Sequence, residues 1–193
     1  MRRLFDIIVS ATALILTSPI LLISAIAIVI ESPGSPLFKQ RRVGKDGVEF
    51  ELFKLRSMVK NAESKGAGLV IEENDSRILK SGNVIRRFSL DELPNLVNVL
   101  KGDMSIIGPR PTVMVQVEKY DERQRGRLKV NPGITGWAQV NGRASLPWSE
   151  RIELDLWYVE HHNAKVDAQI LARTLKLLVT GSGLYRGETG GWR

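Results

Sequence analysis

The sequence predicts an α+β, mainly helical protein that begins with a re-entrant membrane helix-break-helix hairpin. The first observation is an uncharged, largely apolar run from Ile7 to Ile30. The others are two short extended runs around an Asp-Gly turn and amphipathic helical patterns further along the chain. We expect the hairpin over residues 1–31, one compact domain on the cytosolic face over 32–180, and a glycine-rich tail over 181–193.

The composition is that of a globular domain rather than a disordered chain. Of the 193 residues, 25% are charged and 43% are hydrophobic. The formal net charge of +7 indicates anionic partners, such as lipid headgroups, phosphorylated substrates or nucleic acid. The absence of cysteine excludes a disulfide framework and any Cys-based metal or redox site.

The apolar run is long enough to cross a membrane. In a helix of ~1.5 Å rise per residue it could span the hydrocarbon core of about 30 Å. A cleaved signal peptide is an alternative, supported by Arg2, Arg3 and the cleavage-like Ala25-Ile26-Ala27. However, the run continues past that point and exceeds the ~7–15 apolar residues usual in signal peptides, so we expect a retained segment.

The charges around the run favour a hairpin over a single span. A single span would place one of two basic flanks on the wrong side of the membrane. Pro19 lacks the N–H that would bond the Ile15 carbonyl, and the Ser18 hydroxyl can bond a backbone group freed in this way. We therefore expect the bend at Ser18 and Pro19. The basic flanks are Arg2 and Arg3 before the run and Lys39, Arg41, Arg42 and Lys45 after it.

A β-hairpin is predicted directly after the membrane segment. Residues 31–36, rich in proline and serine, are turn-forming and mark the exit from the membrane. Extended runs at 37–42 and 48–55 flank Gly44-Lys45-Asp46-Gly47, and an Asp-Gly between such runs favours a hairpin. Residues 61–76 mix charged and small side chains, which indicates a surface loop.

Three helices are predicted in the remaining chain. The first lies within residues 89–102 and ends at Gly102. The second is indicated by apolar residues at three- and four-residue steps from Trp148 to Val159, and the third covers about 167–180. Residues 131–147 carry too many glycines and prolines near their start to form a long helix.

Asp91 and Glu92 are the leading candidates for chemistry. One interpretation is a capping box, with Ser89 as the N-cap and Glu92 at the third helical position. Pro94 fits better if the helix begins later, with Asp91 near the cap. Two arginines precede the pair, and arginines and helix N-terminal amides both attract phosphate. Carboxylates in this setting hold a divalent cation or attack phosphorus, so capping and chemistry both stay open.

Several other polar residues admit two interpretations. The prolines around Arg110 aim its guanidinium, although the same sequence is also an ordinary turn. Lys54 and Arg56 alternate with Leu55 and could face either a phosphate or solvent. Asp167 is an N-cap of the last helix or a second metal carboxylate.

His161 and His162 suggest a metal pair at first sight. Adjacent side chains at the end of a helix diverge, so we interpret both as surface residues.

Four motifs together resemble the bacterial sugar transferases and, more narrowly, the small monotopic phosphoglycosyltransferases that start membrane glycan assembly. The motifs are FKLRSM (53–58), SLDELPNLVNVLKGDMSIIGPRP (89–111), PGITGWAQVNGR (132–143) and LDLWYVE (154–160). The resemblance extends to about Val179, and its middle block is long and specific. We expect the minimal catalytic form, without the extra transmembrane bundle of larger members.

This resemblance implies a reaction, a cofactor and a location. A UDP-sugar donates sugar 1-phosphate to polyprenyl (undecaprenyl) phosphate, and UMP leaves. The resemblance also implies Mg²⁺ and a monotopic hairpin bent at a Ser-Pro pair, matched here by Ser18-Pro19. The implied location is the bacterial inner membrane, in contact with its lipids, with the active site on the cytoplasmic face.

The resemblance also implies residue roles. Asp91 matches the nucleophile of a two-step transfer through a covalent aspartyl-phosphosugar, and Glu92 matches a metal ligand or proton-transfer partner. A direct single-step transfer, with the carboxylates acting on the metal or as a base, is the alternative. The matched substrate- or phosphate-binding residues are Lys54, Arg86, Arg110 and Arg143, and the matched metal ligands are Glu92 and Asp167.

Two further classes of function fit the sequence less well. Aromatic residues make up only 6%, and the arginines lie among turns and carboxylates, so we expect no nucleic-acid partner. A non-catalytic scaffold for lipid phosphate is disfavoured, because an acidic pair without a metal would weaken anion binding.

Overall fold

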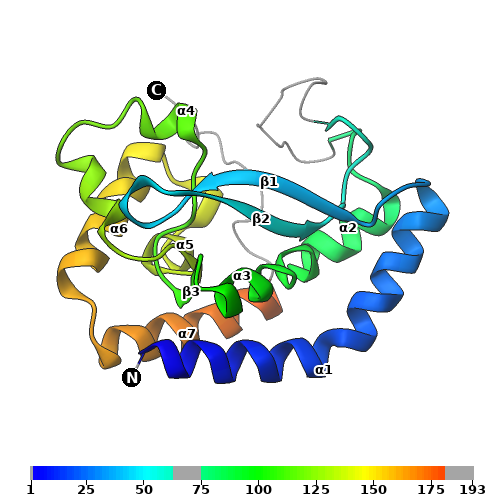
Figure 1. Cartoon of the computed structure of the whole chain (residues 1–193), viewed down its shortest axis with the longest axis horizontal. Coiled ribbons are helices and arrows are strands. Elements are labelled where there is room, and N and C mark those ends of the chain that lie inside the picture. The colour runs from blue at the N-terminus through cyan, green and yellow to red at the C-terminus, as the bar shows by residue number, and fades with distance from the viewer. Residues whose placement is uncertain (1, 63–74, 181–193) are drawn as a thin grey trace.

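A long N-terminal helix and six shorter helices surround two small sheets in the computed structural model, which describes residues 2–62 and 75–180 (Figure 1). Most of the predicted loop at 61–76 and all of the predicted tail at 181–193 lie outside these residues. The helices are α1 Arg2–Glu31, α2 Lys80–Arg87, α3 Asn95–Lys101, α4 Met114–Val117, α5 Trp137–Val140, α6 Trp148–His161 and α7 Ala164–Thr180. The strands are β1 Leu37–Val43, β2 Glu49–Leu55, β3 Ser105–Ile107 and β4 Gly133–Thr135.

Helix α1 bends but does not break. It is helical throughout, with Pro19 inside it, and its ribbon changes direction part-way along (Figure 1). The Ser18 Oγ donates a hydrogen bond of 2.8 Å to the Ile15 carbonyl, the group that the proline leaves without its helical partner. Length and composition would allow α1 to cross a membrane, and only 11% of its most apolar 18-residue window is buried. A helix in the core of a soluble protein would be mostly buried.

Both ends of α1 are attached to the folded domain. Near its start, Arg3 donates to the carbonyls of Val99 and Leu100 in α3. The buried Asp6 carboxylate accepts hydrogen bonds from the Ile106 N–H (3.0 Å) and the Ser105 hydroxyl (2.8 Å) of β3. At the other end, the Glu31 carboxylate accepts from the backbone N–H groups of α2 at Lys80 and Ser81.

The predicted β-hairpin is confirmed. Strands β1 and β2 pair antiparallel, with Leu37 opposite Leu55 and Val43 opposite Glu49. Asp46 (φ 56°) and Gly47 (φ 81°) in the connecting turn both have positive φ, the backbone conformation that an Asp-Gly pair favours in tight hairpins.

The second sheet pairs β3 with β4 in parallel, so residues 131–147 form no long helix, as predicted. The backbones of Gly108 and Gly133 lie so close that a Cβ on Gly133 would be 2.1 Å from the Gly108 nitrogen. The Gly133 N–H also donates to the Pro109 carbonyl at 2.8 Å. This contact holds the Pro-Arg-Pro turn that follows β3.

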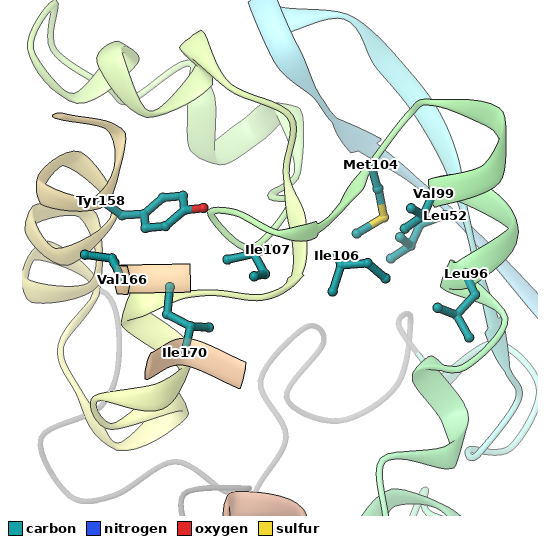
Figure 2. Packing of buried hydrophobic residues seen from close by; sticks show 9 residues of the cluster. All are labelled: Leu52, Leu96, Val99, Met104, Ile106, Ile107, Tyr158, Val166 and Ile170. Carbon is teal, nitrogen blue, oxygen red and sulfur yellow. The ribbon is translucent and has the colours of Figure 1, made fainter. Parts of the chain in front are cut away.

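The main core lies between the two sheets, α3, α6 and α7. Figure 2 shows Ile106 and Ile107 of β3 between residues of α3 and β2 on one side and residues of α6 and α7 on the other. The fully packed members are Leu52, Leu96, Val99, Met104, Ile106, Ile107, Tyr158, Val166 and Ile170. The predicted amphipathic helix is confirmed as α6, which buries Ile152 and Leu156.

Two predicted helix starts are corrected. Helix α7 begins at Ala164, and the Asn163 Oδ1 accepts from the N–H groups of Lys165 and Val166, so Asn163 is the N-cap and Asp167 is not. Helix α3 begins at Asn95, later than the capping-box interpretation required.

Candidate active site

Asp91 and Glu92 lie in a 3₁₀ turn, Leu90–Glu92, that precedes α3. Ser89 has a left-handed backbone (φ 55°) and makes no side-chain cap, so the capping box is wrong. Pro94 takes the N-cap position of α3, where its missing N–H removes no helical bond. The two carboxylates are therefore held by a tight turn outside the regular helix.

The Glu92 carboxylate is held between two cations. The Lys54 Nζ lies 3.1 Å from Glu92 Oε1, and the Arg110 Nη2 lies 2.5 Å from the same oxygen. The Arg110 Nη1 reaches Glu92 Oε2 at 3.2 Å, so the arginine binds in a fork. Burial alone would raise the pKa of Glu92, but the charges of Arg110 and Lys54 outweigh it and hold this pKa well below its ordinary value.

Asp91 has the opposite environment, although it is adjacent in sequence. Its residue is only 8% exposed, and no side chain in the described part of the protein donates a hydrogen bond to its carboxylate. Burial and then the charge of Glu92 raise the pKa of Asp91, while the charges of Lys54, Arg86 and Arg110 oppose the increase. The Glu92 carboxylate is therefore bound by cations, and the Asp91 carboxylate is available for chemistry.

Cations from four separate segments surround this pair. Lys54 comes from β2, Arg86 from α2, Arg110 from the turn after β3 and Arg143 from the 3₁₀ turn Arg143–Ser145. The charges of Glu92, Arg110 and Asp91 all act on Arg143, whose pKa is lowered mainly by burial. The structure thus brings together all four predicted phosphate-binding residues.

Arg56 does not belong to this group. It is buried and donates to the Ser32 carbonyl just after α1, so it serves the fold and faces neither solvent nor the carboxylate pair.

The side chain of Arg127, which the sequence did not single out, holds the backbone of Arg110. The Arg127 Nη2 donates to the Arg110 carbonyl at 3.1 Å and also to the Asp155 carboxylate. Arg127 and Asp155 are 3% and 1% exposed, and the Tyr120 hydroxyl accepts a further bond from Arg127. Asp155 lies on the apolar stripe of α6, and a carboxylate there could have signalled a buried cation.

Asp167 is engaged elsewhere. Its carboxylate accepts a hydrogen bond of 2.9 Å from the Tyr158 hydroxyl and pairs with Arg2 of α1. No contact among residues 2–62 and 75–180 joins Asp167 to Asp91 or Glu92, so its role as a metal ligand stays a prediction. His161 and His162 are exposed, as expected of surface residues.

The carboxylate pair fits the chemistry of Mg²⁺. Within the described part of the chain, no three acidic or histidine side chains cluster as a dedicated metal cage. Mg²⁺ commonly takes only one or two protein carboxylates and completes its shell with water and substrate phosphates. Asp91 and Glu92 supply carboxylate oxygens beside cations suited to phosphates, so a metal held jointly with a diphosphate is compatible with these residues.

A small pocket opens beside Glu92, under the Pro-Arg-Pro turn. Its polar wall includes Arg42, Lys54 and Arg110, and its apolar wall includes Met104 and Ile134.

Comparison with known proteins identifies the relatives of this chain. Residues 1–181 match the family model described as bacterial sugar transferase. The chain is 44% identical over 187 residues to an uncharacterized sugar transferase, EpsL, of Bacillus subtilis, covering 96% of this chain and 91% of that protein.

Two relatives with named activities are longer. The chain is 40% identical over 188 residues to a UDP-N-acetylgalactosamine-undecaprenyl-phosphate N-acetylgalactosaminephosphotransferase of Aeromonas hydrophila, covering 94% of this chain and 44% of that protein. It is 42% identical over 183 residues to a UDP-glucose:undecaprenyl-phosphate glucose-1-phosphate transferase of Escherichia coli, covering 91% and 39%. This chain therefore spans less than half the length of these two proteins.

Proposed function

The chain belongs to the bacterial sugar transferase family, and from this premise we propose that it transfers sugar 1-phosphate from a UDP-sugar to polyprenyl phosphate, releasing UMP. The names of the relatives support the donor and acceptor classes, since they act on UDP-sugars and undecaprenyl phosphate. The product is a membrane-bound lipid diphosphate sugar, the starting point of glycan assembly.

The contrast between Asp91 and Glu92 carries the proposal. Glu92 is bound by Lys54 and Arg110, whereas Asp91 lies among the same cations and, within residues 2–62 and 75–180, receives no side-chain hydrogen bond. A carboxylate without hydrogen bonds, next to charges that attract phosphate, is suited to attack phosphorus. We therefore assign Asp91 as the nucleophile and Glu92 as the residue that positions the cations and helps to hold a metal.

The reaction proceeds in two balanced steps. In the first, an Asp91 oxygen forms a bond to the sugar-linked phosphorus, and the phosphoanhydride bond to UMP breaks. In the second, an oxygen of the lipid phosphate forms a bond to the same phosphorus, and the aspartyl–phosphorus bond breaks, which regenerates the carboxylate. A phosphoanhydride is consumed and another is formed, so no further energy source is required.

The cations stabilise the negative charge on the transferred group. Arg86, Arg110, Arg143 and Lys54 neutralise the phosphoryl oxygens from several sides, and positioning of this kind dominates phosphoryl transfer. Mg²⁺, if held by Glu92 together with the donor diphosphate, would supply additional charge neutralisation. The covalent step removes the need to align a soluble donor and a lipid acceptor at once.

We place α1 in the membrane as a re-entrant element with the domain on the cytoplasmic face. Both of its ends bond to the same domain, which a helix crossing to the far side could not do. Many of its exposed side chains are large and apolar, including Ile15 at 72%, Leu16 at 73% and Ile30 at 77% exposure. Helix α7, joined to α1 through Asp167, exposes Leu175 and is placed at the lipid–water boundary.

The decisive experiment omits the lipid acceptor. Enzyme incubated with Mg²⁺ and a panel of UDP-sugars is expected to release one equivalent of UMP per active site. Peptide mass spectrometry is expected to find the phosphosugar on Asp91. Asp91→Asn should keep its thermal unfolding transition but form neither product. UMP that appears only after the acceptor is added, with no adduct, would support direct transfer instead.

A further inference from the structure

Asn95 is a buried polar residue whose side-chain oxygen makes no hydrogen bond within the described part of the fold. It is the first residue of α3, one turn after Asp91, and it is 3% exposed. Its side-chain Oδ1 is fully buried and has no hydrogen-bond partner among the described residues. Leaving a buried amide oxygen unbonded carries a free-energy cost, so such an atom calls for an explanation.

Asn98, one turn further along the same helix, shows what a structural asparagine looks like. It is 0% exposed, and its Oδ1 accepts from the Phe53 N–H at 3.1 Å. Its Nδ2 donates to the Glu51 carbonyl at 2.6 Å and to Asp103 at 3.1 Å. Asn98 therefore links α3 to β2 by hydrogen bonds, whereas the Asn95 Oδ1 makes no hydrogen bond to any described residue.

Asn95 lines the pocket beside Glu92. The same pocket is lined by Lys54 and Arg110, the cations that hold Glu92, and by the apolar side chains of Met104 and Ile134. This pocket has a cavity of only about 10 Å³, so it admits one small polar group, such as an O–H or N–H, of an organic phosphate whose phosphates lie at the neighbouring cations. The Asn95 amide oxygen would accept from an N–H or O–H beyond the phosphates.

We propose that Asn95 is a donor-binding residue, whose side-chain amide accepts a hydrogen bond from the part of the UDP-sugar outside its phosphates. This inference rests on the proposed function. Two parts of the donor carry suitable groups: the uridine, with its base N–H and ribose hydroxyls, and the sugar, with its hydroxyls. In both cases one hydroxyl or N–H of the donor enters the small cavity beside Asn95, while the phosphates of the donor lie at Lys54 and Arg110.

The test compares the binding of three probes to the full-length protein in detergent, measured by calorimetry. The probes are UMP, glucose 1-phosphate and inorganic phosphate, and the variant is Asn95→Leu, which has a similar shape but no amide. Loss of a hydrogen bond in a buried site is expected to weaken binding of one organic probe about tenfold. Binding of inorganic phosphate, which depends on the cations alone, should change less than about twofold.

The possible outcomes distinguish uridine from sugar as the partner of Asn95, and both from no role in donor binding. A selective loss for UMP assigns Asn95 to the uridine, and a selective loss for glucose 1-phosphate assigns it to the sugar. Unchanged binding of both organic probes, or an equal loss for all three probes, overturns the inference. If the wild-type protein binds UMP and releases UMP from a UDP-sugar, and Asn95→Leu does so equally well, only this inference is overturned. If the wild-type protein neither binds UMP nor releases it from any UDP-sugar, the proposed function is overturned.

Thermal unfolding without ligand provides a second readout. Asn95→Leu removes an unbonded buried amide and is expected to leave the Tm unchanged or raise it. Asn98→Leu, the matched control on the same helix, removes three hydrogen bonds and should lower the Tm clearly. A fall in Tm for Asn95→Leu as large as that for Asn98→Leu would mean that Asn95 is structural, which contradicts the inference.

Discussion

Arg2 at the start of α1 and Asp167 in the first turn of α7 form an ion pair, with 2.5 Å between Nη2 and Oδ2. The same Nη2 donates to the Tyr158 hydroxyl at 2.9 Å, which in turn donates to Asp167. With the Glu31 contacts at the other end of the helix, these bonds fix both ends of α1 to one folded body. The positions of its ends are therefore coupled through the domain.

This coupling predicts that both ends of α1 face the same side of the membrane. The natural chain has no cysteine, so single introduced cysteines give unambiguous labels. A cysteine inserted after Met1 and a Lys45→Cys variant should both react with an impermeant maleimide in inverted vesicles. Both should be protected in right-side-out vesicles. Opposite labelling of the two positions would contradict the re-entrant arrangement.

The charge of Glu92 should set the pH dependence of the reaction through Asp91. Since Glu92 raises the pKa of Asp91, Glu92→Gln is expected to lower that pKa and move the acid limb of the UMP-release profile to lower pH. The plateau rate should fall about tenfold or more, because Lys54 and Arg110 lose their partner. An acid limb that does not move, or moves to higher pH, would contradict the assignment of Asp91.

The same substitution should change stability with a defined pH dependence. The pKa of Glu92 is lower in the folded than in the unfolded protein, so its stabilisation is present above the unfolded pKa and is lost as pH falls through the folded pKa. Glu92→Gln should therefore unfold at a lower temperature than wild type at neutral pH, and the difference should shrink on acidification. Glu153→Gln, which breaks the exposed Arg123–Glu153 pair, is the control and should leave the unfolding temperature nearly unchanged at both pH values.

Local signals in the sequence predicted the elements that depend on local physics. The Asp-Gly turn determined the hairpin, and the apolar periodicity determined α6, because turn conformation and helical spacing involve residues close in sequence. Helix α2 was missed. Its Gly82 is unfavourable for a helix by propensity. A Cβ there would lie 2.0 Å from the Ser57 carbonyl oxygen, so close packing against Ser57 requires glycine at this position.

The site was predictable only in part for the same reason. The residues themselves made Asp91, Glu92, Lys54 and Arg110 candidates, but their roles and the full set of cations came from motif resemblance, because no spacing rule indicates that Lys54, Arg86, Arg110 and Arg143 converge. Asn95 could not be found from the sequence, and Asp155 could signal a buried cation without identifying Arg127, since the significance of both residues depends on burial and on contacts between distant segments.

The close approach of β3 and β4 should be required for the position of Arg110. In Gly133→Ala the new Cβ would lie 2.1 Å from the Gly108 nitrogen and 2.4 Å from the Thr135 oxygen, so the backbones must separate. We expect a loss of about 2–4 kcal/mol in the free energy of unfolding and weaker binding of UMP.

Gly47→Ala is the matched control for this variant. Gly47 has φ 81° but open space around its Cβ position, so strain without a clash should cost only about 1 kcal/mol. Equal losses of stability in chemical denaturation for the two variants would show that the approach of Gly108 and Gly133 is unimportant.

Arg127 should control catalysis through the Arg110 backbone. Arg127→Lys keeps the charge opposite Asp155 but loses the planar fork that also reaches the Arg110 carbonyl, so Arg110 is less firmly placed. We expect kcat/KM for the donor to fall about tenfold, mainly through KM, because Arg110 binds phosphate in the proposed mechanism. Arg123→Lys, in the same segment but 66% exposed, removes a surface fork to Glu153 and should leave both constants unchanged. If Arg127→Lys lowers the Tm but leaves KM and kcat at wild-type values, Arg127 supports only the fold and does not position Arg110.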